Sequence, residues 1–322
     1  MLVTGGGGFI GSHLVEALVA EGADVRTTVR YSSRGDNGSL DNVSKEILSE
    51  VEIVAGDLRD SEWIADAIKG REIVFHLAAQ IAIPYSYVNP RDFFETNVIG
   101  SLNVAQACRA AGTRHVIQTS SSEVYGTAVQ VPITEEHPLS GQSPYAASKI
   151  GADQMMLSFH RSYDLPVTVL RPFNTYGPRQ SWRAVIPTII GQALKGDTVK
   201  LGSLDPRRDL LFVEDTVSGF TAVAQADDVA GKTLQLGTER DVSVGDLVDA
   251  VGELLGRELV VEQDAERVRP ARSEVMRLVS SPAKMNAATG WRAQTSLEDG
   301  LAATARWMET QQDSSAVDQY VI

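Results

Sequence analysis

The chain has 322 residues, of which 43% are hydrophobic and 22% charged, as in an ordinary globular protein with a substantial core. Its formal net charge of −13 disfavours nucleic acid or an anionic membrane as a partner, because phosphate binding needs a basic face. Cys108 is the single cysteine, which excludes an intrachain disulfide and a cysteine metal cluster, and we predict no metal site. The glycine-rich start and the lack of a long apolar run predict a cytoplasmic protein without a membrane anchor.

The first half of the chain alternates β-rich runs with amphipathic helical patterns. Strands are predicted at residues 1–4, 24–29, 51–57, 72–79, 115–121 and 167–172. Helices are predicted at residues 11–21, 61–70, 91–111 and 144–163, the second of them opened by a Ser61 cap and ended by Gly70. This alternation predicts an α/β fold with a doubly wound parallel sheet.

The second half of the chain has a less regular pattern of predicted elements. A loop is predicted at residues 177–182 and a helix at 186–196, followed by a strand–helix–strand unit from "VKLG" to "TLQLG" and a capped amphipathic helix at 243–256. We therefore predict a first domain at 1–172, with contributions from about 205–240, and a smaller C-terminal α/β lobe at 173–310. A polar tail, expected to be frayed, covers residues 311–322.

A glycine-rich segment, "VTGGGGFIG", follows the first predicted strand and opens the first helix. Gly5, Gly8 and Gly11 permit a tight turn and allow a pyrophosphate to approach the helix N-terminus, as in a Rossmann dinucleotide-binding domain. The alternative interpretation is an ordinary glycine-rich turn. The predicted cofactor contacts also include Phe9, Ile10, Leu58, Leu77, Ala78 and Ala79.

The end of the second predicted strand bears on the choice of dinucleotide. Arg30 stands where an NAD-preferring site usually carries an acidic residue, and arginine suits a 2′-phosphate, so NADP is favoured over NAD. Alternatively, Arg30 stacks on the adenine and the cofactor is NAD. Asp57, after the third strand, is predicted to accept a hydrogen bond from the adenine amino group, or else is a solvated turn carboxylate.

A tyrosine and a lysine are spaced to share one helix face. Tyr145 and Lys149 are four residues apart. A free tyrosine has a pKa of about 10, which a nearby ammonium and a cationic nicotinamide would lower enough for a base. Ser121, at the end of the preceding strand, is placed to hydrogen-bond the same substrate oxygen. Asn97 is expected to anchor a water or Lys149 through the backbone.

The segments "TGGGGFIG", "LAAQ", "SSSEVYG", "SPYAASK" and "RPFNTYGPRQ" together resemble the extended short-chain dehydrogenase/reductases that act on nucleotide sugars. The resemblance runs from Leu2 to about Trp307, nearly the whole chain. It implies a Rossmann domain with a small sugar-nucleotide lobe and a tightly bound, recycled NAD(P). It also implies a homodimer built from the helices near 91–111 and 144–163.

The resemblance further implies roles for single residues. Tyr145 would be the base on the sugar C4 hydroxyl, Lys149 its pKa modulator and a nicotinamide-ribose ligand, and Ser121 the hydroxyl partner. The predicted substrate-binding residues are Ser122, Asn174, Arg183, Arg208 and Arg269. Arginines suit a diphosphate because a guanidinium binds it bidentately. The alternative interpretation is that the arginines of this lobe form solvated salt bridges.

Glu123 bears on which reaction the site performs. Ser121, Ser122 and Glu123 resemble the Thr-Ser-Glu set of GDP-mannose 4,6-dehydratases, and the longer runs are similar to 4,6-dehydratases of bacterial N-acetylated sugar pathways such as legionaminic acid synthesis. The dTDP-glucose 4,6-dehydratases have Asp where this chain has Ser122, so Glu123 is expected to act both as the C5 base and as the acid for the C6 hydroxyl.

Three other functions compete with 4,6-dehydration of a nucleotide sugar. A nucleotide-sugar 4-epimerase needs no C5 base, and UDP-glucuronate decarboxylases also resemble the "SSSEVYG" pattern. A non-catalytic dinucleotide-binding sensor on the same fold is a different class of protein. Intact Ser121, Tyr145 and Lys149 argue against the sensor, which has no use for them.

Overall fold

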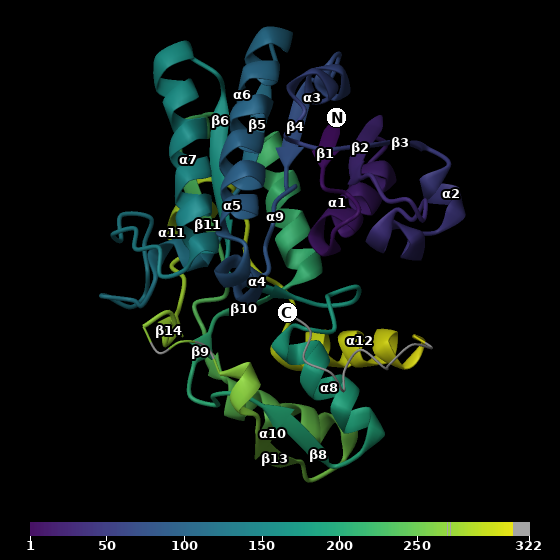
Figure 1. Cartoon of the computed structure of the whole chain (residues 1–322), viewed down its shortest axis with the longest axis vertical. Coiled ribbons are helices and arrows are strands. Elements are labelled where there is room, and N and C mark those ends of the chain that lie inside the picture. The colour runs from purple at the N-terminus through teal and green to yellow at the C-terminus, as the bar shows by residue number, and fades with distance from the viewer. Residues whose placement is uncertain (269, 271, 312–322) are drawn as a thin grey trace.

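The protein is built around a seven-stranded, wholly parallel sheet. The computed structural model describes residues 1–268, 270 and 272–311 (Figure 1). The strands lie in the order β11 (Thr233–Leu236), β6 (Val167–Pro172), β5 (His115–Thr119), β4 (Ile73–His76), β1 (Leu2–Thr4), β2 (Val25–Arg30) and β3 (Val51–Gly56). The strand order reverses between β1 and β4, the crevice where a doubly wound sheet binds its ligand. The predicted α/β fold is therefore confirmed.

Helices cover both faces of this sheet. On one face α1 (Phe9–Ala20) packs on α9 (Val213–Gln225), and together with the sheet they form one apolar core. On the other face α3 (Ser61–Ile68), α6 (Gly100–Ala111) and α7 (Pro144–Tyr163) form a second core (Figure 1). Cover on both faces explains why every residue of the inner strands β1, β4, β5 and β6 is buried, with no alternation of buried and exposed positions.

A second group of elements forms the lower part of Figure 1 around its own apolar core. Its helices are α8 (Val185–Lys195), α10 (Val244–Leu255) and α12 (Leu297–Glu309). Its small sheets pair β7 (Asn174–Tyr176) with β10 (Leu210–Phe212), β8 (Thr198–Leu201) with β13 (Val260–Gln263), and β9 (Arg207–Arg208) with both β12 (Val242–Ser243) and β14 (Arg277–Leu278). The chain returns from this region to the main sheet through α9 and β11. Residues 312–322 of the predicted tail lie outside the described residues.

Several shorter elements connect these layers. They are α2 (Lys45–Leu48), α4 (Ile83–Val88), α5 (Pro90–Phe93) and α11 (Ala283–Thr289), a π-helix at Phe94–Ile99, and 3₁₀ helices at Gly38–Asn42, Ser122–Tyr125 and Ala265–Arg267. The helix predicted near 91–111 is thus α5, the π-helix and α6 in continuous succession.

Caps explain where the long helices begin. The Ser143 hydroxyl accepts from the Ala146 amide and Pro144 occupies the first turn of α7, as the predicted start at 144 requires. The predicted Ser61 cap of α3 is wrong: the Asp60 carboxylate accepts from the Glu62 and Trp63 amides, because a carboxylate one residue earlier is an equally good cap. No helix in the described part of the chain is long and apolar enough to cross a membrane.

Candidate active site

The glycine loop lies at the carboxyl end of β1, and each of its three key glycines meets different surroundings. Gly5 has a φ of 77°, and a Cβ there would lie 2.8 Å from the Ala78 backbone. A Cβ on Gly11 would lie 2.2 Å from the Gly5 carbonyl oxygen, so helix and turn are in close contact. On Gly8 the nearest atom would be 3.2 Å away, at the same oxygen. Gly8 therefore leaves open backbone at the start of α1, which fits the approach of a dinucleotide pyrophosphate.

The carboxyl ends of β1 and β4 are joined by a chain of buried hydrogen bonds that the sequence did not reveal. Ser101 Oγ donates to the Asn97 carbonyl, so His76 Nε2, 3.2 Å away, is the donor to Ser101. His76 Nδ1 then accepts from Thr4 Oγ1 at 2.8 Å, and Thr4 Oγ1 accepts from the Ala78 amide. Burial lowers the pKa of His76 to about 3, which keeps the imidazole neutral and suited to this chain.

The predicted adenine side of the site is more exposed. Arg30 is the exposed last residue of β2, and Asp57 follows β3. The Arg59 guanidinium and amide both donate to Asp57, which holds the pKa of this carboxyl below its usual range. Leu58 is buried against Gly100, and Leu77 pairs its amide with the Thr4 carbonyl.

Tyr145 and Lys149 are both buried on α7, beside the carboxyl end of β5. The Lys149 ammonium donates to the Thr119 carbonyl at 2.6 Å. Burial lowers the pKa of Lys149 to about 8, and Asp153 opposes that change. Burial raises the pKa of Tyr145 to about 12, opposed by a hydrogen bond with Ser121 and reinforced by Glu123 and Asp153. In the protein alone, burial thus outweighs the predicted lowering of the Tyr145 pKa.

Asn97 holds the loop after β4 against α7. Its side chain accepts from the Gln80 amide at 2.8 Å and donates to the Gln80 carbonyl and to Ser148 Oγ. The contact that anchors Lys149 comes from the backbone of Thr119 rather than from Asn97.

Ser121, Ser122 and Glu123 lie in a turn directly after β5. The strand ends at Thr119, two residues before the predicted end, and the 3₁₀ helix Ser122–Tyr125 follows. Ser121 Oγ caps this helix by accepting from the Glu123 amide at 3.2 Å. Glu123 as a whole residue is only 9% exposed. The cap of this helix therefore comes from Ser121 and not from the Glu123 carboxylate.

The predicted substrate-binding residues are more scattered. Asn174 begins β7, and its side-chain oxygen is buried with no hydrogen-bond partner in the described structure, as expected for an atom that awaits a ligand. Arg208 is largely buried in β9 and contacts Glu274 at 3.3 Å. Arg183 is exposed just before α8, and Arg269 lies outside the described residues.

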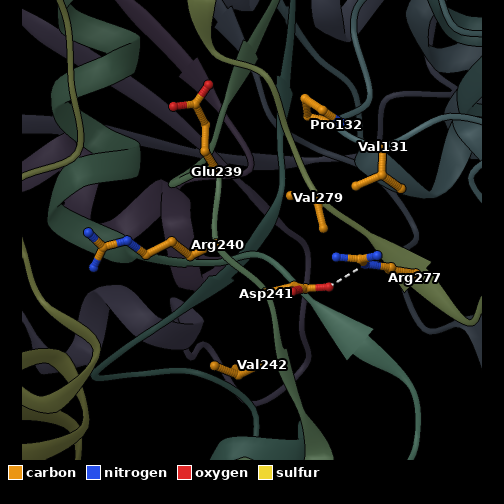
Figure 2. Close-up of a pocket in the computed structure, with 8 residues that line it drawn as sticks. All are labelled: Val131, Pro132, Glu239, Arg240, Asp241, Val242, Arg277 and Val279. Carbon is orange, nitrogen blue, oxygen red and sulfur yellow. Dashed lines mark hydrogen bonds and ion pairs between the residues drawn. The ribbon is translucent and has the colours of Figure 1, made fainter.

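A surface pocket lies between the loop at Val131 and Pro132 and the segments that carry β12 and β14 (Figure 2). Its lining residues are Val131, Pro132, Glu239, Arg240, Asp241, Val242, Arg277 and Val279. Arg277 Nε donates to the Asp241 carboxylate across it at 2.6 Å. Among the predicted site residues that the structure describes, none lines this pocket, so it is separate from the turn that carries Glu123.

Comparison with known proteins identifies the family. The family model described as GDP-mannose 4,6 dehydratase matches residues 2–304. The chain belongs to this family. The predicted resemblance to nucleotide-sugar enzymes among the short-chain dehydrogenase/reductases is thereby confirmed, and the chain is an enzyme of the nucleotide-sugar dehydratase, epimerase and decarboxylase group.

Individual relatives have different activities within this group. The chain is 33% identical to a UDP-glucose 4-epimerase of Mycolicibacterium smegmatis, over 95% of this chain and 97% of the relative. It is 32% identical to the solved dTDP-glucose 4,6-dehydratase DesIV from Streptomyces venezuelae, with a TM-score of 0.86 and 96% of each chain covered. It is 31% identical to MoeE5, solved with UDP-glucuronic acid and NAD, with a TM-score of 0.85 over 96% of this chain and 98% of that one. DesIV also has NAD bound. These structures confirm NAD(P) as the family's cofactor.

Proposed function

We propose that the protein is a nucleotide-sugar 4,6-dehydratase, which converts an NDP-hexose to the 4-keto-6-deoxy sugar and water. The observation that carries this proposal is the buried Glu123 carboxylate, placed one turn after β5 and close enough to raise the pKa of Tyr145. A 4-epimerase needs only the proton of the C4 hydroxyl to be removed. The Glu123 carboxylate provides the same site with a second base, which can act on C5.

The proposed catalytic residues come from two elements of the fold. The face of α7 presents Tyr145 and Lys149, and the turn after β5 presents Ser121 and Glu123. When bound, the nicotinamide would accept the hydrogen and two electrons from C4 and return them to C6. The open backbone at Gly8 and the buried Lys149 fit such a cofactor. Because the electrons return to the sugar, the cofactor ends unchanged and remains bound.

The side chains of Tyr145 and Glu123 transfer the protons of the reaction. Tyr145, hydrogen-bonded to Ser121, takes the proton of the C4 hydroxyl, for which its pKa must fall from about 12. The positive charges of Lys149 and of the bound nicotinamide favour that fall. The C4 ketone acidifies C5, and Glu123 removes the C5 proton. The same carboxyl then protonates the C6 hydroxyl, which leaves as water, and a solvent proton is delivered back to C5.

Substrate placement is proposed to depend on Ser122, Asn174, Arg183, Arg208 and Arg269. The buried, unpartnered oxygen of Asn174 supports a contact with the sugar or its phosphate linkage. The Arg208 guanidinium supports a diphosphate contact, since it is held on β9 by Glu274. We also propose a homodimer, supported by the exposed apolar side chains of Phe94, Ile99 and Tyr163 on the segments that carry the pairing helices.

The direct test is to incubate the purified protein with UDP-, GDP- and dTDP-hexoses in D₂O, without added cofactor, and to follow the sugars by NMR. Dehydration predicts a new C6 methyl group and deuterium at C5. Inversion at C4 with hydrogen retained at C5 would instead make the protein an epimerase. Loss of a C6 carboxylate from UDP-glucuronic acid would make it a decarboxylase.

A further inference from the structure

A buried ion pair lies beneath the turn that carries Glu123. Asp153 on α7 is 0% exposed and Arg171 on β6 is 3% exposed. Asp153 Oδ2 accepts from Arg171 Nη2 at 3.0 Å and from Nε at 3.3 Å. Replacing such a buried ion pair by apolar residues often leaves the stability of a protein unchanged or raises it. The pair is therefore weak evidence of a stabilising role, and we ask instead whether it positions the turn.

The ion pair holds the turn at both ends. Ser120, the residue before Ser121, donates its hydroxyl to Asp153 Oδ2 at 2.6 Å. At the other end, Arg171 Nη1 donates to Tyr125 Oη at 2.9 Å. Residues 121–124 are therefore bracketed by two hydrogen bonds to the same pair of charges.

The Tyr125 end of the turn is also held by a hydrogen bond from β11. Gln235 Nε2, on β11, donates to Tyr125 Oη at 2.6 Å. The Arg171 guanidinium also lies over the Tyr125 ring, 5.0 Å from its centroid. Tyr125 is fully buried, so two donors lose their acceptor if its hydroxyl is removed.

The same ion pair is attached to the other half of the site. Asp153 follows Lys149 by four residues and Tyr145 by eight, so the three side chains share one face of α7. All three are buried. The position of the turn is thus fixed relative to the helix that carries the C4 base.

We propose that Asp153 and Arg171 form a positioning pair, which holds the turn at Ser120 and Tyr125 and thereby sets the Glu123 carboxylate against C5 of the substrate. This inference rests on the proposed dehydratase function. It predicts that loosening either anchor impairs proton removal at C5, performed by Glu123, much more than oxidation at C4, performed with Tyr145 and Lys149.

Two conservative variants test this prediction, because charge removal at Asp153 or Arg171 risks misfolding. Ser120→Ala removes the first anchor, and Tyr125→Phe removes the second while keeping the ring. Tyr176→Phe is the matched control: it also removes a buried tyrosine hydroxyl, one that donates to the Leu297 carbonyl away from the turn. The measurements are the absorbance of reduced nicotinamide on mixing with substrate, and the rate of deuterium entry at C5.

The expected result is a fall of about tenfold or more in C5 deuteration for Ser120→Ala and Tyr125→Phe, with C4 oxidation retained and reduced nicotinamide accumulating. Without substrate, amide hydrogen exchange of residues 121–124 should accelerate by about tenfold in the same variants. Tyr176→Phe should leave all three readouts unchanged.

Two different failures are distinguishable. If the wild-type protein turns over a sugar but incorporates no deuterium at C5, the proposed function fails and the positioning inference falls with it. If the wild-type protein deuterates C5, and the variants lose C4 oxidation and C5 deuteration equally or lose neither, then the positioning inference alone is overturned.

Discussion

Alanine is predicted to have different effects at two glycines of the same loop. At Gly11 it should lower the stability of the protein, and at Gly8 it should weaken dinucleotide binding. A Cβ at Gly11 would lie 2.2 Å from the Gly5 carbonyl oxygen and 2.9 Å from its carbon, both backbone atoms that a rotamer change cannot move. A Cβ at Gly8 would meet only the Gly5 oxygen, at 3.2 Å, and the φ of Gly8 is −82°, which alanine adopts readily. Gly11→Ala should therefore destabilise the fold. Gly8→Ala should instead place a methyl group where a pyrophosphate would lie.

The magnitudes follow from these distances. Overpacking against backbone destabilises a protein by about 1–3 kcal/mol, and we expect Gly11→Ala to reach the upper part of that range. Gly8→Ala fits its conformation and restricts the unfolded chain, so the nucleotide-free protein should change by less than about 1 kcal/mol in either direction. Its added methyl group should weaken dinucleotide binding by about 1.4 kcal/mol or more, which is a factor of about ten in Kd.

The assay combines urea unfolding of nucleotide-free protein with calorimetric titration of NAD and NADP. Gly8→Ala should unfold at nearly the wild-type urea concentration and bind the dinucleotide at least about tenfold more weakly. Gly11→Ala should unfold at a clearly lower concentration. Wild-type affinity in Gly8→Ala, or equal losses of stability in both variants, would refute the assignment of Gly8 as the open position.

Three further predictions concern other parts of the site. Tyr145→Phe should abolish turnover while leaving dinucleotide affinity within about threefold of wild type, as product NMR and calorimetry would show; measurable turnover would exclude Tyr145 as the base. Arg30→Ala should weaken NADP binding by about tenfold and NAD binding less, and equal losses would leave no role for a 2′-phosphate contact. Because the pKa of His76 falls from 6.5 to about 3 on folding, its unfolded form takes up a proton below pH 6.5 while the native form does not, so stability is full above that pH and is lost on acidification. Urea unfolding of His76→Gln should therefore show a shallower loss of stability between pH 6.5 and 3 than the wild type, and an unchanged slope would contradict the burial argument.

The sequence was most informative where local pattern and long-range structure agree. The helix over Pro144–Tyr163 and the strand over Val167–Pro172 were predicted to the residue, because a serine–proline start and a buried apolar run are local signals. The short strands β9, β12 and β14 have two residues each, too few for any alternating pattern to appear.

Contacts between distant segments were beyond the sequence. Arg171 and Asp153 are common residue types in unremarkable positions, and only the packing of β6 against α7 shows that they neutralise each other beneath the turn. The same holds for Tyr125 and Gln235, which are 110 positions apart. Glu123 was predicted as a site residue, but its place on a 3₁₀ helix became visible only once β5 was seen to end at Thr119.

The central claim is that Glu123 removes the C5 proton, and Glu123→Gln tests it most directly. The substitution preserves the size of the side chain and removes its basicity. With a substrate that the wild-type protein dehydrates in D₂O, we expect the variant to reduce its bound nicotinamide but to incorporate no deuterium at C5 and to form no C6 methyl group. Deuterium at C5 at the wild-type rate in Glu123→Gln would show that another base removes the C5 proton.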